Sequence, residues 1–207
     1  MKRIRIPEAD GKPYAMHEDG VWYFVTHYNI YVCKDSAPLG KVAPGMDIFI
    51  GDEQYTVLGH GQDTTALLYS GRHTVFCTPH VCEDDVVLDA LAKAENCCIF
   101  IPKDMLVPHT VKLMAANGDR PQKNIKCDIS LLTMDLYRRY RPYLADKELD
   151  EFWLATPTSY THKNNELCFV REDGRVGWCP YPHSYFIRPF IIVDSAYTGY
   201  SLPELPE

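Results

Sequence analysis

Phe152-Trp153-Leu154-Ala155-Thr156-Pro157 opens the stretch that decides the fold of this chain, a series of short apolar runs in its last third. The later runs are Leu167-Cys168-Phe169-Val170, Arg175-Val176-Gly177-Trp178, Tyr185-Phe186-Ile187 and Phe190-Ile191-Ile192-Val193. Short runs rich in β-branched and aromatic residues predict strands. Glu172-Asp173-Gly174-Arg175 contains an Asp-Gly pair of the kind that closes tight hairpins. The last third is therefore predicted to be built from strands.

Upstream of these runs, strand and helix patterns are segregated along the chain. Residues 47–58 and 65–69 are β-rich runs separated by Gly and Asp turns, which predicts an antiparallel meander. Residues 84–95 have apolar spacings near three and four after an acidic start, which predicts a helix. A second helix is predicted over 131–140, with Thr133 as a candidate N-cap and Pro142 ending it. Segregated elements predict the α+β class and not a doubly wound sheet.

A Pro/Gly-rich connection over residues 37–45 suggests a domain boundary. Residues 1–43 are predicted to form a β-rich appendage, because Val21–Val25 and Ile30–Val32 read as short strands. Residues 44–194 form the predicted main domain. Residues 195–207 form a C-terminal tail without periodicity, of the kind that normally frays.

The composition sets limits on the class of partner. Hydrophobic residues make up 46% of the chain and charged residues 24%, which is typical of a globular protein and not of a disordered one. A net charge of −7 removes the general attraction to phosphate backbones, so nucleic acid is not an expected partner. The basic cluster Arg138, Arg139 and Arg141 is interpreted as the solvated end of an amphipathic helix.

Membrane insertion is not expected, because no apolar stretch approaches the roughly 20 residues needed to span a bilayer. Residues 1–7 break off before an apolar signal-peptide core, so synthesis in the cytoplasm is expected. The eight cysteines are then expected to be reduced thiols without a structural disulfide.

No cofactor and no metal are predicted. His73, Cys77, His80 and Cys82 are the residue types that zinc prefers, but their spacing fits none of the usual zinc motifs. Whether Cys77, His80 and Cys82 bind a metal is left open. The sequence also leaves open whether Cys168 and Cys179 bind a metal or form a disulfide.

Three motifs of this chain resemble, in order and spacing, a bacterial and phage domain family of unknown function. They are Phe152-Trp153-Leu154-Ala155-Thr156-Pro157, Asp173-Gly174-Arg175-Val176 and Phe186-Ile187-Arg188-Pro189-Phe190. The family has Trp-Trp-Leu-Arg-Ser-Pro, Asp-Gly-Ser-Val and Gly-Val-Arg-Pro-Ala at these places. The runs 51–58, 66–68 and 129–133 are also similar, so the likeness extends from about residue 44 to about residue 194.

The family in turn resembles the fold of C-type lectins, formylglycine-generating enzymes and receptor-binding proteins of some phages. The resemblance implies a sandwich of short strands with two helices, with Trp153, Asp173, Gly174, Arg188 and Pro189 as its signature. Ala155 replaces the family's Arg, so any contact made by that Arg is absent. Arg188 is expected to serve an ion pair or a carbonyl cluster. Trp153 and Trp178 are expected to be core aromatics and not a sugar-stacking platform.

Two segments between the matched motifs are rich in residues that suit a binding surface. The candidate ligand-binding residues are Tyr160, His162, Asn164 and Asn165 in the first segment, and Tyr181, His183 and Tyr185 in the second. Ordinary polar hairpin loops are the alternative interpretation, since loops are polar in any case.

The sequence therefore suggests a non-enzymatic binding or structural protein. The resemblance implies a phage virion component, such as a capsid decoration, tail or fibre-associated protein, acting in an oligomer on protein partners or a host surface ligand. The alternative is an enzyme or accessory protein of the formylglycine-generating type, with a site at Cys168 and Cys179. No complete catalytic motif is visible.

Overall fold

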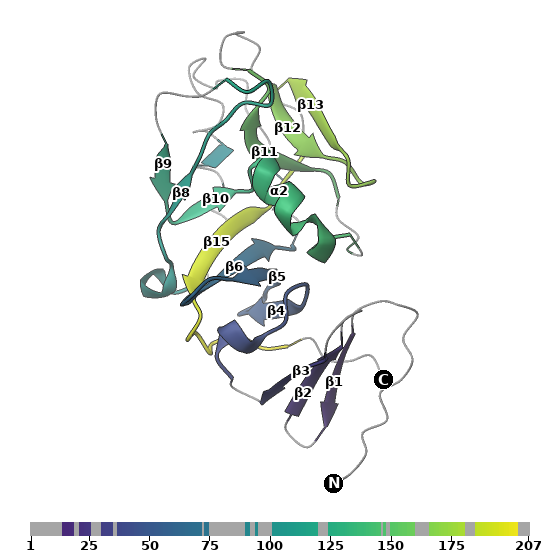
Figure 1. Cartoon of the computed structure of the whole chain (residues 1–207), viewed down its shortest axis with the longest axis vertical. Helices are drawn as coiled ribbons and strands as arrows, with labels where there is room; N and C mark the ends of the chain where they lie inside the picture. The colour runs from purple at the N-terminus through teal and green to yellow at the C-terminus, as the bar shows by residue number, and fades with distance from the viewer. Residues whose placement is uncertain are drawn as a thin grey trace.

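The computed structural model shows an α+β protein in which antiparallel sheets dominate (Figure 1). It describes residues 14–18, 21–25, 30–34, 37–71, 73–74, 90–91, 94, 101–119, 124–145, 147, 150–159, 166–180 and 185–202. No helix among these residues is long and apolar enough to cross a bilayer.

The first sheet is a three-stranded antiparallel meander near the N-terminus. Its strands are β1 (Tyr14–Glu18), β2 (Val21–Val25) and β3 (Ile30–Lys34), in that order. None of the three pairs with a strand of another sheet among the described residues. The predicted strands of the N-terminal appendage are therefore present.

The second sheet has the order β10-β15-β6-β5-β4. Its strands are β4 (Asp47–Ile50), β5 (Glu53–His60), β6 (Thr64–Tyr69), β10 (Ile129–Leu131) and β15 (Pro189–Asp194). The predicted meander is confirmed as β4-β5-β6. The last strand, β15, lies antiparallel against β6 and joins the end of the domain to its start.

The third sheet has the order β13-β12-β11-β14-β7. Its strands are β7 (His73–Thr74), β11 (Phe152–Pro157), β12 (Glu166–Val170), β13 (Val176–Pro180) and β14 (Phe186–Ile187). Ala155 N donates to Leu132 O at 2.9 Å, which holds this sheet to the end of β10. The predicted C-terminal strands are thus confirmed.

The remaining elements are short. A hairpin is formed by β8 (His109–Val111) and β9 (Ile125–Cys127), and 3₁₀ turns cover Leu39–Lys41, Lys103–Met105 and Arg141–Tyr143. The helix α2 spans Met134–Tyr140, and its N-cap Thr133 accepts a hydrogen bond from Leu136 N at 3.2 Å. In the segment predicted as the first helix, Ala90, Leu91 and Ala94 are helical and buried, and the rest lies outside the described residues.

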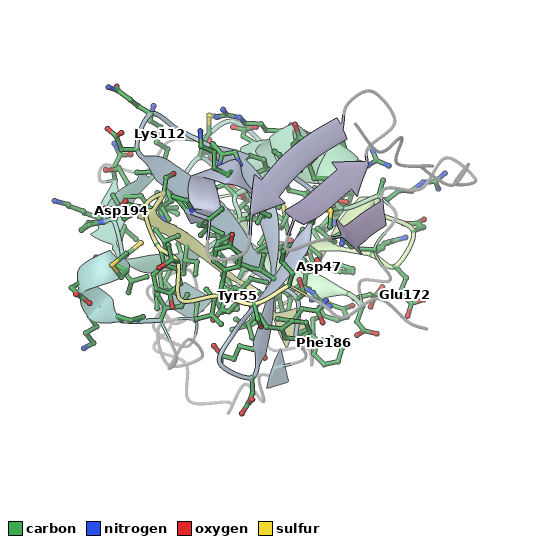
Figure 2. All side chains as sticks on the ribbon, turned by 90° about the horizontal axis from the view of Figure 1, so that it is seen from below. Asp47, Tyr55, Lys112, Glu172, Phe186 and Asp194 are labelled. Atoms are coloured by element: carbon green, nitrogen blue, oxygen red, sulfur yellow. The ribbon has the colours of Figure 1, made fainter. Side chains whose placement is uncertain are left out.

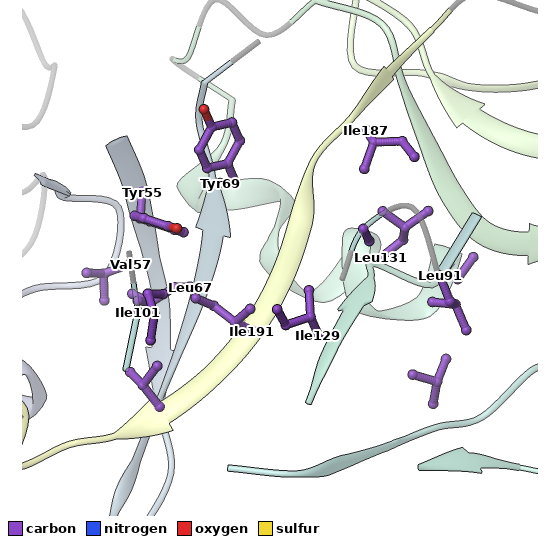
Figure 3. Close-up of a cluster of buried hydrophobic side chains, with 14 of the residues drawn as sticks. Tyr55, Val57, Leu67, Tyr69, Leu91, Ile101, Ile129, Leu131, Ile187 and Ile191 are labelled. Carbon is purple, nitrogen blue, oxygen red and sulfur yellow. The ribbon is translucent and has the colours of Figure 1, made fainter. Parts of the chain in front are cut away.

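Two apolar clusters fill the domain. Figure 3 shows part of the larger one, where Ile129, Ile191, Leu67 and Val57 form a row across neighbouring strands of the second sheet. The smaller cluster lies under α2, where Tyr137 packs edge-on against Phe152 at 6.2 Å. Each side of the sheets thus has its own core.

The packed unit is wider than residues 44–194. Leu39, Val42 and Ala43 are fully buried in the larger cluster. Leu39 N donates to Tyr197 O at 2.8 Å, and Tyr200 and Leu202 pack against the same cluster. Of the tail predicted to fray, residues 195–202 therefore pack against the start of the domain, and residues 203–207 lie outside the described residues.

Candidate functional site

Most of the predicted ligand-binding residues lie outside the described residues. These are Tyr160, His162, Asn164, Asn165, Tyr181 and His183. Tyr185 is described, and its ring stacks on Phe169 with a centroid distance of 4.4 Å. It also contacts Trp153 at 5.0 Å, so it belongs to an aromatic cluster at the base of the predicted loops.

The hydroxyl of Tyr185 forms a hydrogen bond with Cys179. Burial, together with the neighbouring Cys179, raises the pKa of Tyr185 to about 12. The phenol therefore stays protonated at neutral pH. Its ring contacts with Phe169 and Trp153 anchor the start of this segment.

Trp153, Asp173 and Gly174 take structural positions, as predicted. Trp153 is fully buried and meets Phe169 at a centroid distance of 6.1 Å. Gly174 has φ +72° in the turn between β12 and β13, a conformation that favours glycine. The Asp173 side chain accepts a hydrogen bond from Arg175 N at 2.9 Å, which closes the turn.

Arg188 is the carbonyl anchor that the sequence predicted. Its side chain is 1% exposed, and Nη1 donates to Ser70 O at 2.8 Å. Longer contacts of 3.4 Å reach the carbonyl oxygens of Tyr69 and Gly71. Nη2 lies 4.0 Å from Asp150 Oδ2. Pro189, the next residue, is buried and begins β15, where it pairs with Leu131.

The prediction that Trp178 is a core aromatic is wrong, because its side chain is 67% exposed. The physical reason is that Trp178 lies on an edge strand of its sheet. Trp178 lies opposite Cys168 on β13, which is at the edge of its sheet, so it has a neighbouring strand on one side only among the described residues.

Cys168 and Cys179 are free thiols on adjacent strands, but they do not share a site. Cys179 pairs with Leu167, and Cys168 pairs with Trp178. Since successive residues of a strand point to opposite faces, the two sulfur atoms lie on opposite sides of the sheet. Burial raises the pKa of the Cys168 thiol to about 11 and raises that of Cys179 as well, so both are protonated at neutral pH.

The predicted metal-ligand types give no site within the described part of the chain. His73 is described in its backbone only, and Cys77, His80 and Cys82 lie outside the described residues. No group of three or more His, Cys, Asp or Glu side chains in the described part could hold a metal ion.

A pocket of about 140 Å³ lies between the segment 112–118 and the first turns of α2. Its lining combines two cationic side chains, one carboxylate, two methionines and small residues: Lys112, Met114, Ala115, Ala116, Gly118, Thr133, Met134, Asp135, Arg138 and Thr156. Lys112 and Arg138 are both exposed, and Figure 2 shows Lys112 at the periphery of the molecule. We call this hollow the Lys112–Arg138 pocket.

Backbone hydrogen bonds fix one wall of this pocket. Ala116 N donates to Pro157 O at 2.9 Å, and Asn117 N donates to Thr158 O at 3.2 Å. These bonds tie the segment to the end of β11. Gly118 has φ +90° at the tip of the wall, and a methyl group there would meet no atom within 4 Å.

The opposite wall is α2, which β11 holds in place. Met134 N donates to the buried Thr156 Oγ1 at 2.9 Å. Arg138 lies 3.7 Å from Asp135, and both are well exposed, so the pair constrains Arg138 little. A frame held by these hydrogen bonds thus presents two exposed cationic side chains and the exposed Met114 to solvent.

Sequence reasoning selected Arg138 as part of a basic cluster but did not select the pocket. Lys112, Met114 and Gly118 lie in a segment for which no element was predicted, and they meet α2 only through the fold. No sequence signal marked this pocket. Met114 and Arg138 are recognised as neighbours only in the folded structure.

Comparisons with protein-family models, with curated proteins and with solved structures gave no match for this chain.

Proposed function

We propose that this chain is a non-enzymatic binding protein built on a C-type-lectin-like scaffold, and that its ligand presents an anionic group to the Lys112–Arg138 pocket. The observation that carries the proposal is that Lys112 and Arg138 line one pocket, which holds the single carboxylate of Asp135, in a chain whose net charge is −7. Cationic side chains kept in a hollow of an acidic protein suit a carboxylate or phosphate group.

The scaffold part of this proposal is supported by the α+β architecture. Two five-stranded sheets carry short strands, and α2 covers one side of them. Trp153, Gly174 and Arg188 have structural roles at the positions where the resembling family has its motifs. These features support a lectin-like sandwich, in which irregular segments are free to vary for binding.

The apolar part of the pocket limits the ligand to one with a small hydrophobic surface. Met114 is 40% exposed and Met134 lies across the pocket from the segment that carries it. Methionine adapts its shape to partners, which suits a ring face or an aliphatic chain. An acidic sugar of a host surface glycan combines an anionic group with the apolar face of a sugar ring.

Binding of acidic glycans tests the proposal. In a glycan array followed by calorimetry, we expect binding to acidic and not to neutral oligosaccharides. Arg138→Ala should weaken binding about tenfold or more, because a charge-assisted hydrogen bond contributes roughly 1.5–3 kcal/mol. Arg139→Ala is the matched control, since Arg139 lies on the same helix over Tyr140 and does not line the pocket. Equal losses for both variants, or no binding by the parent chain, would contradict the proposal.

We further propose that the protein acts in a phage particle, as a capsid decoration, tail or fibre-associated component. This part is supported by the three ordered motifs alone. Mass spectrometry of purified particles from a host strain that carries the gene should detect the chain in amounts comparable with known structural proteins. Its absence from particles would remove the virion assignment and leave the pocket proposal standing.

A further inference from the structure

Among the described residues, the outer edge of β13 is an open strand edge. β13 is the terminal strand of its sheet, and none of the described residues pairs with its outer side. The terminal strand β4 of the other large sheet is treated differently. Ser201 exchanges two 2.8 Å backbone hydrogen bonds with Phe49 and covers the edge of β4. Within the described part of the chain, the edge of β4 is thus covered and the edge of β13 is not.

The register identifies which backbone groups face outward from β13. Arg171 N donates to Arg175 O at 2.8 Å, and hydrogen-bonded pairs recur at every second residue of an antiparallel ladder. Gly177 and Cys179 therefore direct their backbone groups toward β12. Val176 and Trp178 direct their N–H and C=O groups away from it.

Natural proteins protect open edges with charges, bulges or short strands. β13 is short and ends at Pro180, but Val176–Cys179 carry no charge and pair with β12 without a bulge. Trp178 is 67% exposed beside the outward-facing groups. The strand therefore has the properties of a pairing edge.

We propose that β13 pairs antiparallel with β13 of a second copy of this chain, about a two-fold axis at Gly177. In this register Val176 of each copy lies opposite Trp178 of the other. The two residues of each such pair donate and accept one backbone hydrogen bond each, so every outward-facing N–H and C=O group finds a partner. Pro180, which has no N–H, falls outside the ladder. Because a two-fold interface is self-complementary, one strand supplies both halves.

Side chains fit the same register. Trp178 of one copy lies against Val176 of the other, and aromatic with β-branched pairs stabilise neighbouring strands. At the axis, Gly177 of one copy lies opposite Gly177 of the other as a non-hydrogen-bonded pair, with about 4.5 Å between the Cα atoms. Because glycine has no side chain, nothing hinders this close approach.

Charge complementarity favours this antiparallel arrangement over a parallel one. Arg175 lies opposite Cys179 of the second copy, and its side chain is 81% exposed in the single chain. The carboxylates of Glu151 and Glu166 act electrostatically on Cys179. Arg175, which also lies 3.7 Å from Asp173 of its own chain, therefore faces the acidic surroundings of Cys179 in the other copy, twice.

The molar mass in solution is the first test. Sedimentation equilibrium of the full chain should give twice the 23.7 kDa of one chain at high concentration and one chain on dilution. Trp178→Lys places a charge at the edge and should raise the dissociation constant at least tenfold. Tyr143→Lys, which changes an aromatic that is 40% exposed away from this edge, should leave it unchanged. A single-chain mass at every concentration would overturn the proposal.

A crosslink tests the register itself. Arg175→Cys would place a thiol opposite Cys179 of the second copy at a Cα separation of about 4.5 Å, which suits a disulfide. Diamide, which takes up the two electrons and two protons of the pair of thiols, should then give a covalent dimer with a 175–179 link in peptide mapping. Combining Arg175→Cys with Cys179→Ser should abolish it. A dimer that survives this second change, or that links other cysteines, would refute the register.

Discussion

Arg188→Leu is expected to lower the free energy of unfolding by about 3 to 5 kcal/mol, the loss typical of breaking a buried ionic anchor. The guanidinium is 1% exposed and donates to Ser70 O at 2.8 Å, with Tyr69 O and Gly71 O at 3.4 Å. Leucine would fill most of the volume but would leave these carbonyl groups without their donor. A buried polar group that loses its partner costs about 1 to 3 kcal/mol.

Urea unfolding followed by far-ultraviolet circular dichroism measures this loss. Arg138→Leu makes the same chemical change at a well exposed arginine whose i,i+3 contact with Asp135 is 3.7 Å long, so we expect a loss of about 0.5 kcal/mol or less. Asp150→Asn separates the ion pair from the carbonyl contacts. Because Nη2 lies 4.0 Å from Asp150 Oδ2, this variant should lose much less than Arg188→Leu. Equal stability of the Arg188 and Arg138 variants would contradict the anchoring role.

The position of Arg188 explains why its role was predictable from the sequence. A lone charged residue inside an apolar run can be buried only if the fold supplies partners for it. Local elements were predictable because their signals act within a few residues. The Asp173-Gly174 turn and the N-cap Thr133 are examples. The main difference is at the start of the second predicted helix. Leu131 ends the strand β10, which pairs with β15, and α2 begins only at Met134.

Features that depend on register or edge position were not predictable. Trp178 matches Trp153 in residue type and in strand context, yet one side chain is 67% exposed and the other is fully buried. The difference is the place of each strand in the sheet, which no local pattern encodes. Cys168 and Cys179 likewise occupy adjacent strands, and only the one-residue offset of their pairing separates their sulfur atoms.

The Lys112–Arg138 pocket illustrates a third limit. Its walls come from residues 112–118, from α2 and from Thr156, which are distant in sequence. The hydrogen bonds from Ala116 N to Pro157 O and from Met134 N to Thr156 Oγ1 bring the walls together. Composition showed an acidic chain, and only the fold showed where cationic side chains gather.

Trp153→Ala is expected to lower the free energy of unfolding by about 3 to 5 kcal/mol, as large-to-small changes of buried aromatics do. Trp153 is fully buried between Phe169, at a centroid distance of 6.1 Å, and Tyr185, at 5.0 Å. Alanine would leave a cavity beneath the stacked pair of Phe169 and Tyr185, whose centroids are 4.4 Å apart. The backbone on both sides of the predicted binding loops would then lose its support.

Trp178→Ala is the matched control, measured at a concentration where copies do not pair. Its side chain is 67% exposed, and changes at such positions usually alter stability by about 0.5 kcal/mol or less. Losses of similar size for the two tryptophans would show that Trp153 is not a core residue. If Trp153→Ala stays folded but Tyr185 becomes reactive toward nitration, the aromatic cluster is what holds Tyr185 in place. Because Tyr185 is the one described member of the candidate ligand-binding set, that result would make the cluster the support of any binding surface above it, separate from the Lys112–Arg138 pocket.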